Sequence, residues 1–270
     1  MSKKKCYVVY HGSCPDGFGA AWAFWQNLKD DATYIASFHG KPAPDFAPNS
    51  KIYIVDFSYD KKTLLTLAQQ NEVVLLDHHK TAQADLEGLP FATFDMNKSG
   101  AVLAWEYLHP EKKLPLLLQY VQDRDLWQFK LPYSKELHVY IGTAKYDFAD
   151  WERLYQEFEF ALDDAIEKGK LLLAYDQQNV DSICRQAKLV DFEGYQVPSV
   201  NTPLLNSDVG NKLLELYPAA KFSITWYMDR DSEIKISLRS NSDFDVSAIA
   251  KKYGGGGHFS AAGCRVNKIP

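Results

Sequence analysis

The stretch EVVLLDHH, residues 72–79, decides the fold class. Four consecutive aliphatic residues lead into an aspartate and two histidines, and a short aliphatic run of this kind is typical of a strand buried on both faces of a parallel sheet. Two earlier runs have the same shape, CYVVYH at residues 6–11 and KIYIVD at residues 51–56, and each also ends in a histidine or an aspartate. These three runs predict three strands of one sheet.

The segments between these runs favour helices. GFGAAWAFWQNLK (17–29) follows the first run and YDKKTLLTLAQQN (59–71) follows the second, while TYIASF (33–38) predicts one more strand. Strands that alternate with helices predict an α/β fold, with a mostly parallel sheet flanked by helices.

Three regions differ in character along the chain. Residues 1–150 contain the strand runs and then turn helical, with Ser99 as the expected N-cap of the helix SGAVLAWEYLH. Residues 151–190 are charged and amphipathic, which predicts a helical connector. Residues 191–270 contain strand and helix patterns of a smaller α+β domain.

Composition excludes several classes of protein. Of the 270 residues 46% are hydrophobic, which supports a substantial core, and the net charge of −5 gives no broad basic face for long nucleic acid. Neither an apolar run of membrane-spanning length nor a secretory signal is present, so we expect a cytoplasmic protein without a membrane partner. The four cysteines form no C-x-x-C pair, so we expect neither a zinc ribbon nor disulfides.

Polar residues end the predicted strands: His11, Asp56, Asp77, His78 and His79. The carboxyl ends of parallel strands are where open α/β sheets bind ligands. One such residue is readily explained as a solvated strand end, but three strands that all end this way favour a site. Imidazoles with carboxylates suit manganese, with magnesium, iron or cobalt as alternatives, bound as one or two ions.

Widely separated motifs carry a resemblance to a known family. VVLLDHHKT, with the upstream VDFS and the tail LRSNSDFDVSAIAKKYGGGGHFSAAG (238–263), resembles the DHH phosphoesterase superfamily with its DHH-associated C-terminal domain, in particular its oligoribonuclease-like members. The Asp-His-His triplet alone recurs by chance, whereas its combination with GGGGH-x-x-AAG is specific. The resemblance covers nearly the whole chain and is weakest across the helical connector.

The resemblance implies roles for individual residues. Asp56 would bridge two ions, and His79 would contact the substrate phosphate or leaving oxygen. Asp77 would orient His78 by accepting a hydrogen bond from its other ring nitrogen. Asp125 competes with Asp123 as the ligand from the fourth motif. The implied metal ligands are His11, Asp16, Asp56, His78 and Asp123, and the implied catalytic residues are His79 and Asp56.

The first motif departs from the family pattern of two aspartates separated by one residue. Here Cys14 occupies the place of the first acid and Asp16 that of the second, because an acid followed directly by glycine is then preserved. A second alignment makes Asp16 the first acid and places Phe18 at the second. On the preferred alignment the second ion binds weakly or is absent, and Cys14 is a candidate thiolate ligand.

The C-terminal domain is expected to hold the distal part of the substrate. Four consecutive glycines, 254–257, let backbone amides approach a ligand without a Cβ in the way. The resemblance assigns substrate binding to Arg239, Gly255, Gly256, Gly257 and His258. A cross-strand salt bridge is the structural alternative for Arg239. We interpret His39, His109 and His138 as ordinary surface or satisfied residues.

These patterns predict a manganese-dependent phosphodiesterase that releases mononucleotides from short oligonucleotides or dinucleotides, as an exonuclease does. Other nucleotide phosphate esters are also candidate substrates. Two alternatives remain: a nucleotide-binding or sensing protein that has lost catalysis, and a small-anion pyrophosphatase. The sequence identifies no protein partner and leaves a homodimer open.

Overall fold

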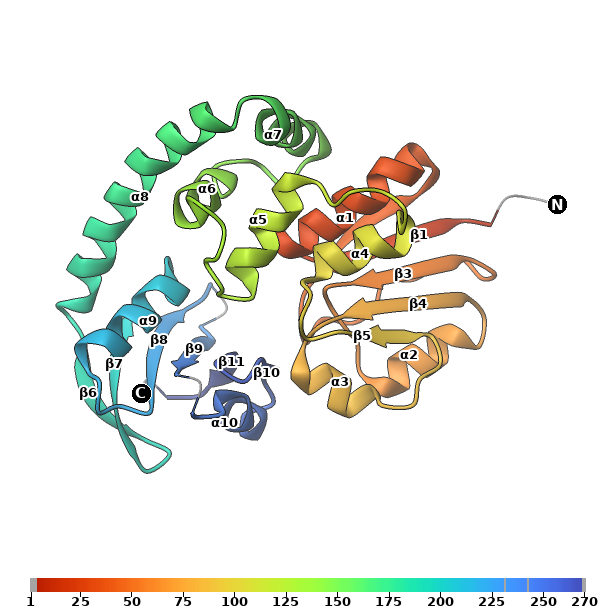
Figure 1. Cartoon of the computed structure of the whole chain (residues 1–270). Coiled ribbons are helices and arrows are strands. Elements are labelled where there is room, and N and C mark those ends of the chain that lie inside the picture. Colours follow the sequence, from red (N-terminus) through yellow and green to blue (C-terminus); the bar gives the residue numbers. More distant parts are fainter. Residues whose placement is uncertain (1–3, 231, 242, 269–270) are drawn as a thin grey trace. The chain divides into compact units, whose positions relative to one another are not determined.

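Five parallel strands form the first sheet of the computed structural model, which describes residues 4–230, 232–241 and 243–268. The strand order is β2-β1-β3-β4-β5, so the three aliphatic runs of the sequence form the three central, adjacent strands (Figure 1). The α/β fold with a mostly parallel sheet is therefore confirmed. The strand bounds are Cys6–His11 (β1), Thr33–Ser37 (β2), Lys51–Val55 (β3), Glu72–Asp77 (β4) and Ala92–Phe94 (β5).

Alternate residues of the central strands pack into cores on opposite faces of this sheet. Val8 and Leu76 pack with α1, α4, α5, α6 and α7 on one face, and Val9 and Leu75 pack with α2 and α3 on the other. Because both faces are buried, the strands are nearly continuous aliphatic runs. The helices are α1 (Pro15–Leu28), α2 (Lys61–Ala68), α3 (Lys80–Leu86), α4 (Gly100–Leu108), α5 (Leu116–Asp125), α6 (Ser134–Ile141) and α7 (Phe148–Phe160), with a short 3₁₀ turn at Lys29–Asp31.

Side chains cap several of these helices. The Ser99 hydroxyl accepts a hydrogen bond from Val102 N at the start of α4, as predicted, and Asp60 caps α2 in the same way through Thr63 N. The α1 helix differs, because its N-cap Cys14 makes no side-chain capping bond and Pro15 follows it. A proline is well tolerated there, because the backbone N–H groups in the first turn of a helix form no hydrogen bond within the helix.

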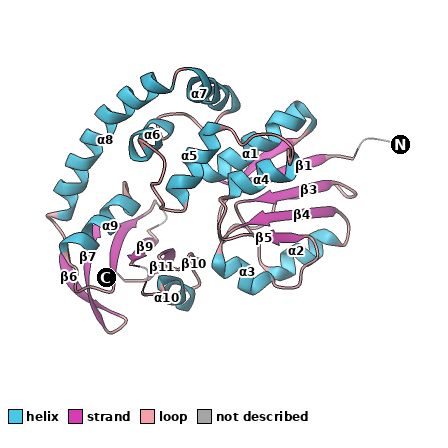
Figure 2. Ribbon diagram, in the orientation of Figure 1, coloured by secondary structure: helices cyan, strands magenta, loops and turns pink. Residues whose placement is uncertain are grey.

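The chain divides into two compact units, residues 1–173 and 174–270, and the boundary falls inside the long helix α8 (Leu162–Cys184). The second unit contains a six-stranded mixed sheet in the order β10-β11-β9-β8-β7-β6, in which β7 and β8 are parallel and the other pairs antiparallel (Figure 2). Its elements are β6 (Lys188–Phe192), β7 (Tyr195–Asn201), α9 (Asn206–Leu216), β8 (Phe222–Met228), β9 (Ile234–Ser240), α10 (Val246–Lys252), β10 (Gly256–Gly257) and β11 (Ala261–Val266).

The second unit has buried clusters of its own. Phe222 and Leu238 from the sheet pack with Val246 of α10, while Val209 of α9 packs with Val180 and Val200. The expected smaller α+β domain at the C-terminal end of the chain is confirmed. Among the helices of the described residues, none is long and apolar enough to cross a membrane.

Candidate metal centre

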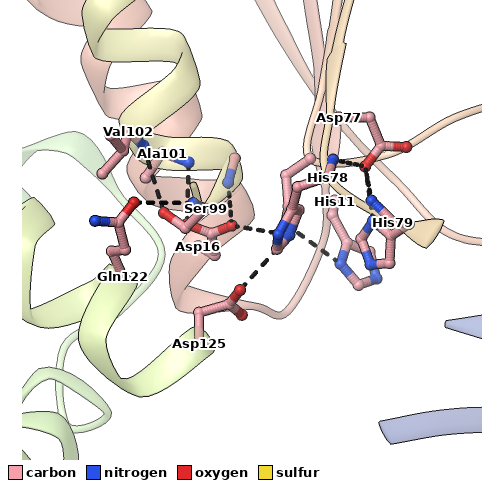
Figure 3. A network of polar contacts seen from close by, with 12 residues as sticks. His11, Asp16, Asp77, His78, His79, Ser99, Ala101, Val102, Gln122 and Asp125 are labelled. Atoms are coloured by element: carbon pink, nitrogen blue, oxygen red, sulfur yellow. Dashed lines mark hydrogen bonds and ion pairs between the residues drawn. The ribbon is translucent and has the colours of Figure 1, made fainter. Parts of the chain in front are cut away.

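The central parallel strands bring their carboxyl ends to one edge of the sheet, and polar residues gather there. His11 is the last residue of β1, Asp56 directly follows β3, and His78 directly follows β4. Since these strands are adjacent and parallel, the three side chains meet although the chain separates them widely. Figure 3 shows His11 and His78 beside the start of α1 and the end of α5.

Asp56 lies between two imidazoles. Its Oδ1 is 3.1 Å from His78 Nε2, and its Oδ2 is 3.6 Å from His11 Nδ1. The residue is 1% exposed, and Oδ2 has no hydrogen-bond partner among the described residues. Burial alone would raise the pKa of Asp56, but its contacts with His11 and His78 outweigh burial and hold that pKa well below the ordinary value. Asp56 is therefore a buried carboxylate that stays ionised.

The backbone at Asp56 is held in an uncommon conformation. Its φ of 54° lies in the left-handed region, which costs a non-glycine residue about 1–3 kcal/mol and persists only where the surroundings impose it. Gly100 packs against this residue so closely that a Cβ there would lie 2.4 Å from the Cβ of Asp56. The start of α4 thus holds Asp56 in place, and only glycine permits the approach.

His78 is surrounded by carboxylates. In addition to Asp56, Asp16 Oδ2 and Asp125 Oδ2 each lie 3.5 Å from His78 Nε2. Against burial, which lowers it, the hydrogen bond to Asp56 and the neighbouring carboxylate charges raise the pKa of His78 to about 10. Three carboxylates around one imidazole make the site strongly negative, so a bound cation would be stabilised there.

Asp16 also joins two elements that are distant in sequence. Its Oδ2 accepts a hydrogen bond from Gly100 N at 2.6 Å and its Oδ1 one from Ala101 N at 3.0 Å, so it caps α4 from the start of α1 (Figure 3). Burial and the charges of Asp56 and Asp125 raise the pKa of Asp16 well above its ordinary value. Position 17 must be glycine for this arrangement. A Cβ there would lie 2.2 Å from the backbone oxygen of His11 and would clash with it.

Two groups of potential ligands adjoin at this edge. Asp16, His78 and Asp125 form one group, and His11, Cys14 and Asp56 form the other; within each, one ligand atom per residue lies within 4.8 Å of the others. Asp56 also contacts His78 of the first group, and its buried Oδ2 has no hydrogen bond from the described residues. Asp16, Asp56 and His78 are buried, whereas Asp125 is exposed. Carboxylates and imidazoles around a buried oxygen without a hydrogen bond fit a divalent cation of borderline hardness.

The geometry reverses the preference between the two fourth-motif acids. Asp123 accepts hydrogen bonds from Lys130 N at 2.9 Å and Leu131 N at 3.1 Å, so its carboxylate serves the loop after α5. Asp125, the competitor, is the acid that lies 3.5 Å from His78. Residues two apart on a helix point in nearly opposite directions, so only one of the pair can face the cluster. In this structure Asp123 holds the loop after α5, and its role as a metal ligand stays a prediction.

Asp77 contacts a different histidine from the one expected. Its Oδ1 accepts from His79 Nδ1 at 2.7 Å and from the backbone N–H of His78 at the same distance, whereas His78 points its Nε2 at the carboxylates. The Ser58 hydroxyl donates to the other oxygen, Asp77 Oδ2. Burial lowers the pKa of His79, but the charge and hydrogen bond of Asp77 outweigh burial and raise it. Asp77 therefore orients His79.

Sequence reasoning missed two residues beside the cluster. The ring of His39 lies with its centroid 5.2 Å from that of His11 and 5.7 Å from that of His79. The sequence contained an indication of His39. It stands two residues after the strand TYIAS, near a strand end like His11, Asp56 and His78. Ser58 is the serine of VDFS, but no local pattern reveals its role. Its contact with Asp77 arises only because β3 pairs with β4.

The predicted substrate-binding residues all lie in the second compact unit. Arg239 donates from Nη2 to Ser207 Oγ at 2.6 Å and from Nη1 to Leu238 O at 2.8 Å. The glycine run packs tightly within that unit, since a Cβ on Gly255 would lie 2.1 Å from Gly263 O. Gly256 and Gly257 form β10, which pairs with β11, and His258 N donates to Ala261 O at 2.8 Å.

Comparisons with known proteins match this chain along most of its length. Residues 209–269 match the DHHA1 domain. Uncharacterized protein R106 of Acanthamoeba polyphaga mimivirus is 36% identical over 286 aligned positions, which cover 97% of this chain and 68% of the relative. Oligoribonuclease NrnB of Bacillus subtilis (strain 168) is 28% identical over 217 positions, which cover 72% of this chain but only 53% of that relative.

Two solved structures share the fold at low sequence identity. An exopolyphosphatase-related protein from Bacteroides fragilis is similar with a TM-score of 0.56 at 16% identity, covering 99% of this chain and 88% of that one. The pGpG-specific phosphodiesterase PggH from Vibrio cholerae is similar with a TM-score of 0.50 at 17% identity, covering 97% and 93%. At these identities the similarity concerns the fold alone.

Proposed function

Because the chain belongs to the DHH phosphoesterase superfamily, we propose that it is a metal-dependent phosphodiesterase that hydrolyses short oligonucleotides or dinucleotides. The observation that carries the proposal is the position of Asp56, a buried ionised carboxylate between His78 and His11 with one oxygen that accepts no hydrogen bond from the described residues. A carboxylate that faces two ligand groups suits the bridging position of a two-metal hydrolase.

The proposal assigns ligands to each ion. Asp16, Asp56, His78 and Asp125 would hold one, and His11, Asp56 and Cys14 would hold the other. We propose manganese as the metal, with magnesium, iron(II) and cobalt as the alternatives to test. Such an ion supplies Lewis acidity and the positive charge that an acidic protein needs to bind a phosphate ester.

His79 is proposed to act on the substrate. The 2.7 Å contact between its Nδ1 and Asp77 Oδ1 fixes the ring and its tautomer. Because Asp77 raises the pKa of His79, the ring keeps a proton near neutral pH and can donate it from Nε2 to a phosphate or leaving-group oxygen. Ser58 holds the second oxygen of Asp77 and so supports the same orientation.

The second unit is proposed to bind the rest of the substrate through Arg239, Gly255, Gly256, Gly257 and His258. The DHHA1 match includes all five positions. Ser207 holds the guanidinium of Arg239, whose planar group suits a phosphate or a base. The names of two similar proteins, an oligoribonuclease and a pGpG-specific phosphodiesterase, support an oligonucleotide or dinucleotide as the substrate.

Hydrolysis of a 5′-labelled dinucleotide and of a short oligonucleotide with manganese tests this function. We expect mononucleotide products from the wild type and none above background from Asp56→Asn or His78→Ala. Asp125→Asn should lose at least roughly 10-fold in metal affinity, since even the loss of an outer-shell partner of a ligand costs that much. Asp123→Asn is the matched control two positions away, and it should lower stability by about 1–3 kcal/mol through the loop while metal affinity stays close to that of the wild type.

The outcomes separate the alternatives. Tight nucleotide binding without turnover across manganese, magnesium, cobalt and iron(II) would refute the enzyme and favour a sensing protein. Turnover of pyrophosphate but not of any nucleotide would favour a small-anion pyrophosphatase. Equal loss of metal affinity in Asp123→Asn and Asp125→Asn would contradict the assignment of Asp125.

A further inference from the structure

The loop that follows α5 carries a pair of aromatic side chains shortly after Asp125 in the sequence. Trp127 and Phe129 meet edge to face, with ring centroids 4.9 Å apart. Trp127 is 36% exposed, although large aromatic side chains usually lie buried. Asp125, two residues earlier, lies 3.5 Å from His78. The aromatic pair therefore begins two residues after a proposed metal ligand.

The backbone of this loop is held in a conformation that aromatic residues rarely adopt. Trp127 has φ 54° and Phe129 has φ 50°, both in the left-handed region. Asp123 holds the loop through the backbone amides of Lys130 and Leu131, and its backbone oxygen accepts from Gln128 N at 2.8 Å. Two unfavourable conformations fixed by one buried carboxylate indicate that the display of these rings serves a purpose other than packing.

Cations flank both rings. The guanidinium carbon of Arg124 lies 3.9 Å from the centre of the Trp127 ring, and Lys135 Nζ lies 5.2 Å from the centre of the Phe129 ring. Residues 124–135 contain three cations, Arg124, Lys130 and Lys135, and a single acid, Asp125, in a chain of net charge −5. Asp123 and Glu136 flank this range, so the observation that matters is the contact of two cations, Arg124 and Lys135, with the rings themselves.

Aromatic rings interleaved with cations are the surface on which proteins bind single-stranded nucleic acid. Bases stack on the rings whatever their identity, while the cations attract the phosphates. An apolar partner protein would instead require a surface depleted of charge at its centre. The cations beside the rings therefore favour a negatively charged ligand, and the rings favour one with planar groups.

We propose that Trp127 and Phe129, with Arg124 and Lys135, form a stacking site for a base of a single-stranded oligonucleotide beside the scissile phosphate. The inference rests on the proposed function and specifies its substrate. The substrate is a single strand long enough to place one base on this loop, and any base can occupy the site. The catalytic efficiency of the wild type should accordingly rise from the dinucleotide to strands of a few nucleotides.

Binding measured without hydrolysis tests the site. Fluorescence anisotropy of labelled single-stranded oligonucleotides with hydrolysis-resistant phosphorothioate linkages, added to the full chain with manganese, gives the affinity for a dinucleotide and for longer strands. We expect Trp127→Ala to weaken binding of the longer strands by about 5- to 100-fold, since one base loses its stacking partner. Trp127→Phe should retain most of the affinity. Phe160→Ala is the matched control, because Phe160 is 81% exposed at the end of α7 in the same unit.

Each outcome is decisive. Equal affinities for Trp127→Ala and Phe160→Ala would overturn the stacking site, even if the wild type hydrolyses oligonucleotides. Should Trp127→Ala fail to fold, quenching of tryptophan fluorescence by the oligonucleotide, larger in the wild type than in Trp127→Phe, supports the site, and equal quenching overturns it. An absence of hydrolysis with intact, Trp127-dependent binding would overturn the proposed function and leave the stacking site standing.

Discussion

Cys14 is the residue at which the proposed metal site departs from the two-aspartate pattern of the first motif. Its Sγ lies within 4.8 Å of ligand atoms of His11 and Asp56, so the substitution has not removed a potential ligand from the site. Burial and the charges of Asp56 and Asp125 raise the pKa of the Cys14 thiol well above its usual range. The thiol therefore stays protonated until a cation offsets those carboxylates.

The identity of the residue at position 14 should set metal preference. Cys14→Asp is expected to strengthen manganese binding and weaken cadmium binding, each by at least roughly tenfold, because a carboxylate is harder than a thiolate. Metal titration by calorimetry measures the affinities, and the ultraviolet band of a cadmium thiolate reports on the sulfur directly. Cys6→Ser is the control, and a cadmium band that persists in Cys14→Ser but vanishes in Cys6→Ser would refute the assignment.

At the scale of elements, the contact between α4 and the end of β3 builds the site. Asp16 caps α4 from α1, across 84 positions of sequence, and Gly100 at the start of α4 packs on Asp56. The same few atoms therefore join the start of α1 to the start of α4 and support Asp56. A displacement of α4 would disturb Asp16 and Asp56 together.

Gly100→Ala should consequently damage both stability and metal binding. The new Cβ would lie 2.4 Å from Asp56 Cβ and 2.9 Å from Asp56 Cα, so backbone must move. We expect a loss of about 1–3 kcal/mol in the free energy of unfolding and weaker metal binding, measured by chemical denaturation and calorimetry. Gly142→Ala is the control, since its nearest neighbour would lie 3.4 Å away. Equal effects of the two substitutions would show that the approach of α4 is unimportant.

At the scale of the whole molecule, the metal centre belongs to one of two units that each have their own core. Every proposed ligand lies in residues 1–173, while the predicted substrate-binding residues lie in 174–270. A ligand that binds only the native state of one unit stabilises that unit. Metal removal should therefore act on the two units unequally.

Scanning calorimetry with manganese and with EDTA measures this difference. At a free metal concentration 100 times the dissociation constant, binding contributes about 2.7 kcal/mol, which should raise the melting temperature of the first unit by roughly 5–10 °C. The transition of the second unit should stay where it is. Asp56→Asn should abolish the shift, and an equal shift of both transitions would contradict a centre confined to the first unit.

Local patterns predicted much of this molecule. The aliphatic runs predicted β1, β3 and β4, and their terminal residues His11, Asp56 and His78 do converge, because parallel strands end at the same edge. The same pattern in TYIASFH points to His39, which stands two residues after the end of β2. The choice between Asp123 and Asp125 lay beyond local patterns, since both stand at the end of one helix.

The sequence by itself determined the α/β class, the alternation of the first four strands with helices, the family, and the residue types that end the central strands. These follow from periodicity and short motifs, which depend only on neighbours along the chain. Only the tertiary structure decided that Asp125 faces His78, that Asp77 orients His79, and that Asp16 caps α4. The reason is that these contacts join distant elements, and the packing of α4 and α5 on the sheet selects which side chains meet.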